Sequence, residues 1–137
     1  MKKVSIAVIG CGRIGQMHAK NVQLHEKTNL ACIYDPNDEF AKKISIDLGI
    51  QAVKNVDEIF NNDEIDAVLI SSPTNTHIDF IEKSVAAKKP VFCEKPIDLD
   101  IHKVNECSKR LEGNTIPIQL GFNRRFDPGH QAAKKSL

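Results

Sequence analysis

Three glycines directly after a short apolar run place the strongest constraint on the fold of this chain. The run at 4–9 is rich in β-branched residues and leads into Gly10-Cys11-Gly12-Arg13-Ile14-Gly15, after which a segment of helical periodicity begins. In this context the glycines permit a tight turn, close approach of the backbone to a pyrophosphate and tight packing of helix on strand. Amides at the start of a helix bind phosphate. The motif therefore predicts a dinucleotide site formed by Gly10, Gly12, Arg13, Ile14 and Gly15.

The rest of the chain alternates short apolar runs with longer segments of helical periodicity. Predicted strands occupy residues 4–9, 30–34, 51–53, 67–70, 90–93 and 116–122. Predicted helices occupy residues 13–25, 38–48, 56–61, 77–88 and 99–111, and another begins near residue 128. This alternation indicates parallel strands joined by right-handed crossovers. We therefore predict an α/β Rossmann fold over residues 1–123, with a doubly wound, parallel, six-stranded sheet and helices on both faces.

Length and composition limit the classes of function. A chain of 137 residues suits one domain. Its net charge of +1 gives no basic surplus for nucleic acid, and no apolar run approaches the roughly 20 residues that span a bilayer. The four cysteines form no Cys-x-x-Cys pair and lack the spacing of zinc ligands. We expect buried thiols, no metal site, no nucleic acid or membrane partner, and a reducing, cytoplasmic setting.

Asp35 ends the second predicted strand, 20 residues after Gly15. A carboxylate at this spacing accepts hydrogen bonds from the hydroxyls of the adenosine ribose and repels a 2′-phosphate. No arginine follows immediately, since the next residues are Pro36 and Asn37. We therefore predict NAD rather than NADP as the cofactor. The alternative is that Asp35 caps the turn before Pro36, and one carboxylate can serve both roles.

Small polar residues follow the fourth predicted strand, at the point where loops line the cofactor crevice of such a sheet. Ser71, Ser72 and Thr74 can approach phosphate and ribose there, and Thr76 can cap the next helix. His77 leaves two alternatives open with equal weight: a residue of the cofactor crevice, or a helix-start residue packed against the loop. A metal role for His77 has no support from a second ligand nearby.

Lys95 follows the fifth predicted strand in the string Cys93-Glu94-Lys95-Pro96. A lysine at the carboxyl end of a central strand lies at the mouth of the crevice, where it is suited to proton transfer. From spacing alone, a surface lysine is nearly as good an interpretation. Arg124 and Arg125 follow the sixth predicted strand, and from sequence alone they fit a solvated turn as well as a phosphate contact.

In order and spacing, these strings resemble the glucose–fructose oxidoreductase/inositol dehydrogenase family over nearly the whole chain. The matching strings are Gly10–Gly15 with His18 and Asn21, Asp35-Pro36, Ser72-Pro73-Thr74-Asn75-Thr76-His77, Glu94-Lys95-Pro96 and Gly121-Phe122-Asn123-Arg124-Arg125-Phe126. The ending around Arg124 is most similar to that of the inositol 2-dehydrogenases in the family.

The resemblance implies NAD(P)-dependent oxidation of a secondary alcohol of a sugar or cyclitol, with myo-inositol as the best candidate. It implies that Lys95 is the catalytic lysine and also touches cofactor and substrate, and that Lys95–Pro96 is a cis peptide. It places Glu94 and Asn75 near the nicotinamide ribose, and Arg124 toward the substrate.

Members of that family are more than twice as long and carry a second, α+β domain that supplies an Asp and a His for proton transfer. We expect that domain to be absent from this sequence, with residues 124–137 starting the connection to it and the chain alone inactive. The alternative is a stand-alone NAD-binding module without catalysis. Apolar surface that the second domain covers is expected to drive association into homo-oligomers.

Overall fold

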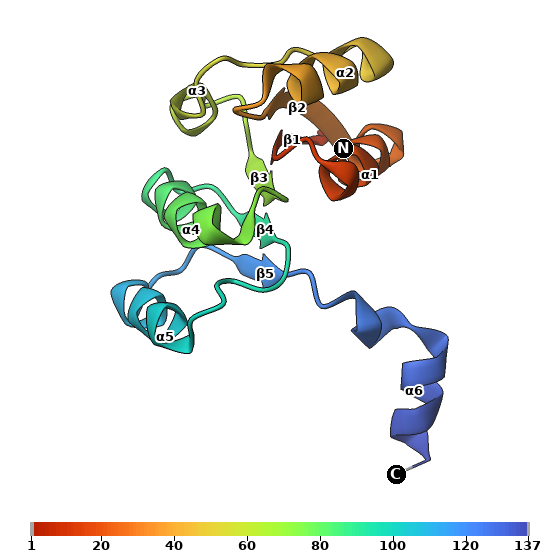
Figure 1. The fold of residues 1–137 in the computed structure, drawn as a ribbon, viewed down its shortest axis with the longest axis vertical. Coiled ribbons are helices and arrows are strands. Elements are labelled where there is room, and N and C mark those ends of the chain that lie inside the picture. The colour runs from red at the N-terminus through yellow and green to blue at the C-terminus, as the bar shows by residue number, and fades with distance from the viewer. Residues whose placement is uncertain (1, 137) are drawn as a thin grey trace.

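A parallel sheet forms the centre of the computed structural model, which describes residues 2–136. Within that range the sheet has five strands in the order β2-β1-β3-β4-β5 (Figure 1). Their bounds are Val4–Ile9 (β1), Thr28–Tyr34 (β2), Ala67–Ile70 (β3), Val91–Cys93 (β4) and Ile118–Leu120 (β5). Every neighbouring pair is parallel. The Rossmann-like α/β architecture predicted from sequence is confirmed, but the number of strands is not.

The prediction of a strand at 51–53 is wrong. Ala52 forms one isolated parallel bridge to Ile33, made by two hydrogen bonds of 3.0 and 2.9 Å on the backbone of Ile33. The chain turns immediately afterwards because the Glu58 carboxylate accepts hydrogen bonds from the amides of Lys54 and Asn55. The extended segment is therefore too short to continue the ladder beyond β2.

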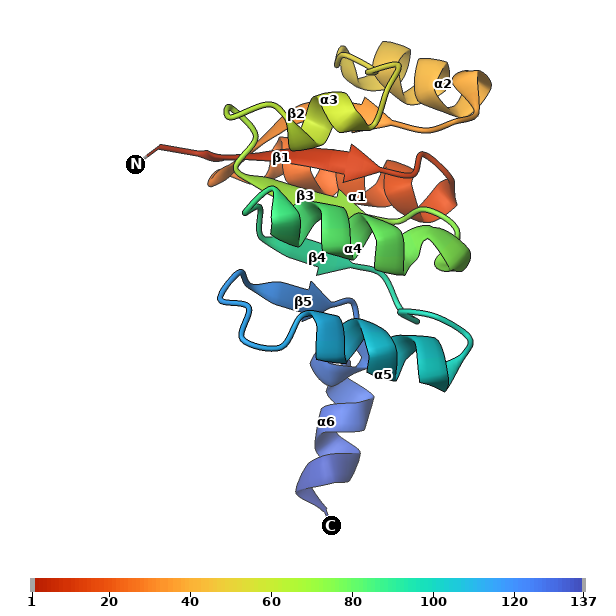
Figure 2. The ribbon, with the colours of Figure 1, turned by 90° about the vertical axis from the view of Figure 1, so that its left-hand side faces the viewer.

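Helices lie on both faces of the sheet. In Figure 2, α3 (Asp57–Phe60), α4 (His77–Ala86) and α5 (Ile101–Arg110) lie in front of the strands, and α1 (Arg13–Leu24) lies behind them. The helix α2 (Asp38–Leu48) packs against β2. Asn37 begins α2, because its side chain accepts hydrogen bonds from the amides of the first turn.

The core has two parts because both faces of the parallel sheet are covered. In β1, Ala7 and Ile9 belong to the part facing α3 and α4, whereas Val8 belongs to the part facing α1. The α1 side also contains Ala19, Val22, Leu30, Ile33, Ile44 and Leu69. The other side contains Cys32, Ile59, Phe60, Val68, Ile70, Ile81, Val91 and Cys93.

After β5 the chain leaves the sheet. A short 3-10 turn, η2 (Asn123–Phe126), leads into α6 (Pro128–Lys135), which extends away from the rest of the domain (Figure 1). Asp127 caps α6 by accepting a hydrogen bond from the His130 amide. None of the helices described in residues 2–136 has the length and apolar character needed to span a membrane.

Candidate cofactor-binding site

The turn between β1 and α1 depends on Gly10. Its φ of +96° is a conformation that side chains disfavour, and a Cβ there would lie 2.4 Å from the amide nitrogen of Ser72. The Gly10 amide donates to the carbonyl of Tyr34 at 2.8 Å. Gly10 thus lets the β1–α1 turn fit between the end of β2 and the loop after β3, as the glycine pattern predicts.

Gly15 and Gly12 serve different purposes in the same loop. A Cβ on Gly15 would lie 1.8 Å from the Gly10 carbonyl oxygen, so this position needs glycine for packing. A Cβ on Gly12 would meet nothing within 4 Å, so no described protein atom requires a glycine there. Gly12 is the residue before the first turn of α1 and has no side chain to cap the helix. The first turn of α1, which lies within the described residues, contains no acidic side chain. The space at Gly12 therefore fits a ligand that approaches the first amides of α1.

Asp35 connects the end of β2 to the glycine loop. One carboxylate oxygen accepts a hydrogen bond from the Cys11 amide at 2.7 Å, and the other accepts from the Asn37 amide at 2.8 Å. Asp35 therefore caps the turn before Pro36, which was one of the two roles considered from the sequence. Burial, and secondarily the charge of Asp35, raises the pKa of the Cys11 thiol to about 12.

A cavity of about 480 Å³ opens over this loop. Seven of the predicted cofactor residues line it: Gly10, Gly12, Arg13, Ile14, Asp35, Ser71 and Ser72. Four residues that the sequence analysis did not select also line it: Pro36, Asn37, Phe40 and Pro73. Phe40 is half exposed although it is aromatic. Its position in the first turn of α2, a few residues after Asp35, is the sequence signal that could have identified it as a residue of the cavity.

The loop after β3 closes one side of this cavity through its own hydrogen bonds. The Ser71 hydroxyl donates to the carbonyl of Gly10 at 3.0 Å, which connects this loop to the glycine turn. The hydroxyls of Ser72 and Thr76 are 2.7 Å apart, and Thr76 also donates to the Pro73 carbonyl. The predicted cap by Thr76 is therefore wrong, because its hydroxyl bonds within the loop and does not accept from the amides of α4.

His77 is buried below this loop and is 2% exposed. Its Nδ1 lies 2.7 Å from the carbonyl oxygen of Pro96, and its Nε2 lies 2.8 Å from that of Ser72. The ring thus connects the loop after β3 to the loop after β4 and is absent from the lining of the 480 Å³ cavity. Thr74 and Asn75, on the short turn η1 (Thr74–Thr76), are also absent from that lining.

Lys95 is exposed at the carboxyl end of β4, and the Lys95–Pro96 peptide is cis, as the resemblance implied. The neighbouring Glu94 contacts His18 of α1, with 2.7 Å between Oε1 and Nε2. Glu94 and His18 line a second cavity, of about 240 Å³, next to the end of β5. The contact between His18 and Glu94 was missed from sequence, since 76 residues separate them.

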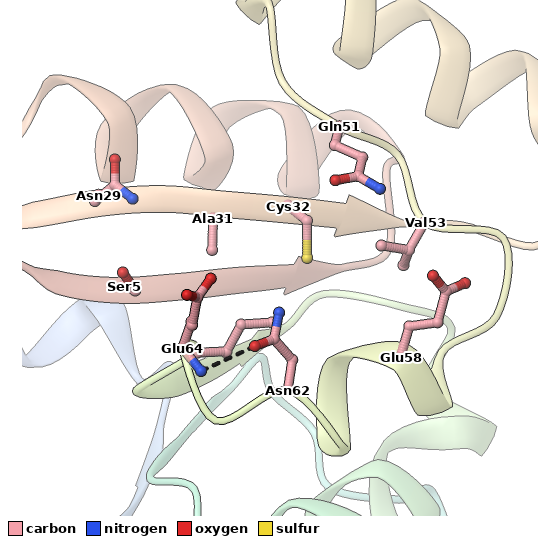
Figure 3. A pocket seen from close by; sticks show the side chains of 10 residues that line it. Ser5, Asn29, Ala31, Cys32, Gln51, Val53, Glu58, Asn62 and Glu64 are labelled. Carbon is pink, nitrogen blue, oxygen red and sulfur yellow. Dashed lines mark hydrogen bonds between the residues drawn. The ribbon is translucent and has the colours of Figure 1, made fainter.

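Arg124 is exposed on η2, with a guanidinium nitrogen 3.7 Å from the Asp127 carboxylate, and it lines neither cavity. A third, polar cavity of about 360 Å³ lies along β1 and β2, between Ser5 and Asn29 on one side and Cys32 and Val53 on the other (Figure 3). Ser5, Asn29 and Glu64 are among its lining residues, and none of the predicted site residues is. Nowhere in residues 2–136 do three His, Cys, Asp or Glu side chains come together in a way that could hold a metal ion.

The carboxylate after β2, the glycine turn after β1 and the open start of α1 define the class of dinucleotide-binding domains. A family model described as "Oxidoreductase family, NAD-binding Rossmann fold" (GFO_IDH_MocA) matches residues 4–122. The chain belongs to this family and contains its NAD-binding Rossmann fold.

Named relatives agree with this assignment. The chain is 40% identical over 134 residues to the inositol 2-dehydrogenase of Rhizobium meliloti (strain 1021), covering 98% of this chain and 40% of that protein. It is 36% identical over 137 residues to the scyllo-inositol 2-dehydrogenase (NAD(+)) of Bacillus subtilis (strain 168), again covering 98% and 40%.

Among solved structures, the scyllo-inositol dehydrogenase of Lactobacillus casei with bound cofactor NAD(H) and scyllo-inositol superposes with a TM-score of 0.88 at 33% identity. That match covers 98% of this chain and 40% of the solved chain. The chain therefore spans about two fifths of the length of its relatives.

Proposed function

We propose that this chain is the cofactor-binding part of an NAD-dependent dehydrogenase that oxidises a secondary alcohol of a sugar or cyclitol. The observation that carries the proposal is the position of Lys95, exposed at the carboxyl end of β4 at the same sheet edge as the glycine cavity. The printed names of the relatives support myo-inositol and scyllo-inositol as the first substrates to test.

The chain's own residues fit NAD in the 480 Å³ cavity. The amides that follow Gly12 would bind the pyrophosphate, with Arg13 and Ile14 beside it, and Ser71 and Ser72 would form the opposite wall. Asp35 would accept hydrogen bonds from the adenosine ribose and disfavour the 2′-phosphate of NADP. The exposed ring of Phe40 offers the adenine an apolar surface. Bound NAD⁺ supplies the hydride acceptor of the reaction.

Lys95 is proposed to act at the reacting hydroxyl, whose proton leaves toward the lysine as the C–H bond breaks. Asn75 and Glu94 would lie at the nicotinamide ribose, and Arg124 would reach toward the substrate. His77 is proposed to contribute indirectly, because its contacts with Ser72 and Pro96 fix the two loops on either side of the nicotinamide position.

A stand-alone NAD-binding module without catalysis is the second candidate function, because the family model that matches residues 4–122 describes the NAD-binding fold alone. We propose residues 1–123 as the binding domain and 124–137 as the start of a connection. Homo-oligomer formation is proposed through a mostly apolar hollow of about 220 Å³ over β3 and β4, lined by residues including Leu69 and Phe92. The four buried free thiols support a cytoplasmic setting.

Two preparations test the proposal. The first is the chain itself, titrated with NAD⁺ in a calorimeter and assayed with myo-inositol. The second is a chimera in which this chain replaces the matching segment of the Rhizobium meliloti relative. We expect NAD⁺ binding in both and turnover in the chimera. Lys95→Ala in the chimera should abolish turnover with NAD⁺ binding intact. Retained turnover in that variant would remove Lys95 from its proposed role.

A further inference from the structure

A histidine and a carboxylate join α1 to the end of β4. His18 Nε2 lies 2.7 Å from Glu94 Oε1, and the two side chains are only 14% and 21% exposed. Because a carboxylate only accepts hydrogen bonds, His18 is the donor at Nε2. The second oxygen of Glu94 accepts a hydrogen bond from the amide of Lys95 at 3.3 Å. Both oxygens of the carboxylate are thus held by the protein.

Packing holds each member of the His18–Glu94 pair in place. A Cβ on Gly121, after β5, would lie 3.1 Å from the carboxyl carbon and from both oxygens of Glu94. The ring of Phe92 meets the ring of His18 edge-on, with 5.5 Å between the centroids. Glu94 is therefore confined between α1 and the end of β5, and its charge has a defined position.

The surroundings of this charge are largely apolar. The 240 Å³ cavity that the pair faces is lined mainly by apolar residues, which come from α1, from β4 and from the segment between β5 and the end of η2: Met17, Phe92, Leu120, Phe122 and Phe126. Among the described lining residues, His18 and Glu94 are the only ionisable ones. Charge interactions are stronger in such surroundings than in open water.

The strand order gives the direction in which a dinucleotide would lie. Asp35 follows the outer strand β2, the glycine loop follows β1, Ser71 follows β3 and Glu94 follows β4. A dinucleotide lies across the carboxyl ends of such strands. With the adenosine ribose at Asp35 and the pyrophosphate at the glycine loop, the nicotinamide half extends toward β3 and β4.

We propose that the Glu94 carboxylate, oriented by His18, makes this site prefer NAD⁺ over NADH. The inference rests on the cofactor orientation given under the proposed function. The nicotinamide ring of NAD⁺ carries a positive charge that NADH lacks, so a fixed negative charge at this end stabilises the oxidised form selectively. Asp35, at the adenosine end, faces a part of the cofactor that is the same in both forms.

The test compares dissociation constants of NAD⁺ and NADH for the same protein, measured by calorimetry at pH 8.0. In Glu94→Gln, which keeps the shape and an acceptor for His18, we expect the affinity for NAD⁺ to fall about three- to tenfold more than that for NADH. Asp35→Asn should weaken both cofactors by equal factors. Glu112→Gln, an exposed carboxylate on the turn after α5, should leave both affinities unchanged and controls for net charge.

The role of His18 is tested by two substitutions with thermal unfolding as the check on folding. His18→Gln retains an N–H donor and should keep the preference for NAD⁺, expressed as the dissociation constant of NADH divided by that of NAD⁺. His18→Phe should reduce this ratio. Loss of binding caused only by disturbed packing would weaken NAD⁺ and NADH alike. An unchanged ratio in folded Glu94→Gln that still binds both cofactors would overturn this inference alone. Failure of the unaltered chain to bind either cofactor would overturn the proposed function with it.

Discussion

The carboxylate of Asp35 accepts a hydrogen bond from the backbone amide of Cys11 at 2.7 Å, so the end of β2 shapes the loop that follows β1. The same carboxylate lines the 480 Å³ cavity. Asp35 is therefore both part of the scaffold and part of the cavity wall.

The first prediction concerns cofactor choice. We expect the chain to bind NAD⁺ at least about tenfold more tightly than NADP⁺, because Asp35 repels the extra phosphate. Asp35→Ser should narrow that difference by improving NADP⁺ binding relative to NAD⁺. Calorimetric titrations of both proteins with both cofactors measure the effect. Equal affinities in the unaltered chain would contradict this role of Asp35.

The second prediction concerns Gly15. Its Cβ would lie 1.8 Å from a backbone oxygen that cannot move independently, so Gly15→Ala should cost about 3 kcal/mol or more in the free energy of unfolding. Gly12→Ala is the matched control, since the same added methyl group meets open space. Urea unfolding of both variants gives the comparison. Similar stability of the two variants would rule out the packing described for α1.

The third prediction concerns His77. Replacing the ring by phenylalanine removes the two nitrogens that lie 2.7 and 2.8 Å from the carbonyl oxygens of Pro96 and Ser72, and we expect a loss of about 2–4 kcal/mol in the free energy of unfolding. The exposed His102, changed to phenylalanine in the same way, should alter stability by less than about 0.5 kcal/mol. Thermal and urea unfolding report both values. A His77 variant as stable as the His102 variant would contradict the connecting role of the ring.

The fourth prediction concerns the thiols of Cys11 and Cys93. Burial first, and the neighbouring carboxylates Asp35 and Glu94 second, raise the pKa of each from 9.0 to about 12. The folded state therefore keeps these protons when the unfolded state loses them, and stability should fall as the pH rises above about 9.

Urea unfolding at pH 8 and pH 10 measures that fall. In the matched variant Cys11→Ala/Cys93→Ala the decrease between the two pH values should be smaller. A thiol reagent at pH 8 should also label the folded protein slowly and the unfolded protein rapidly, since the described cysteines are all buried. An equal pH dependence in the variant and the original chain would show that these thiols are not responsible.

Strong local signals made much of the fold predictable. The strands β1 and β3 and the helix α2 have the predicted bounds, because β-branched runs and the breaking residues around them mark these elements within a few positions. The bridge at Ala52 was predicted as a strand because the sequence does not reveal how few hydrogen bonds a three-residue run will form.

The residues of the candidate site can also be divided into those that local sequence spacing predicts and those that it does not. The glycine loop and Asp35 follow from local spacing, and both line the cavity. The contacts of His77 join the loops after β3 and β4, and the pair His18–Glu94 joins α1 to the end of β4, so both depend on segments that are far apart in the sequence. Thr76 was misassigned because a hydroxyl at a helix start can bond backward into its loop as easily as forward into the helix.

Binding of NAD⁺ to Gly12→Val, compared with the original chain, tests the central claim most directly. The claim is that a pyrophosphate lies against the first amides of α1, in the space that a side chain at Gly12 would fill. Because no protein atom lies within 4 Å of a Cβ there, the variant should fold with nearly unchanged thermal stability. We predict that NAD⁺ binding, measured by calorimetry, falls at least about a hundredfold, close to 2.7 kcal/mol. A folded Gly12→Val protein that binds NAD⁺ as tightly as the original chain would contradict the account.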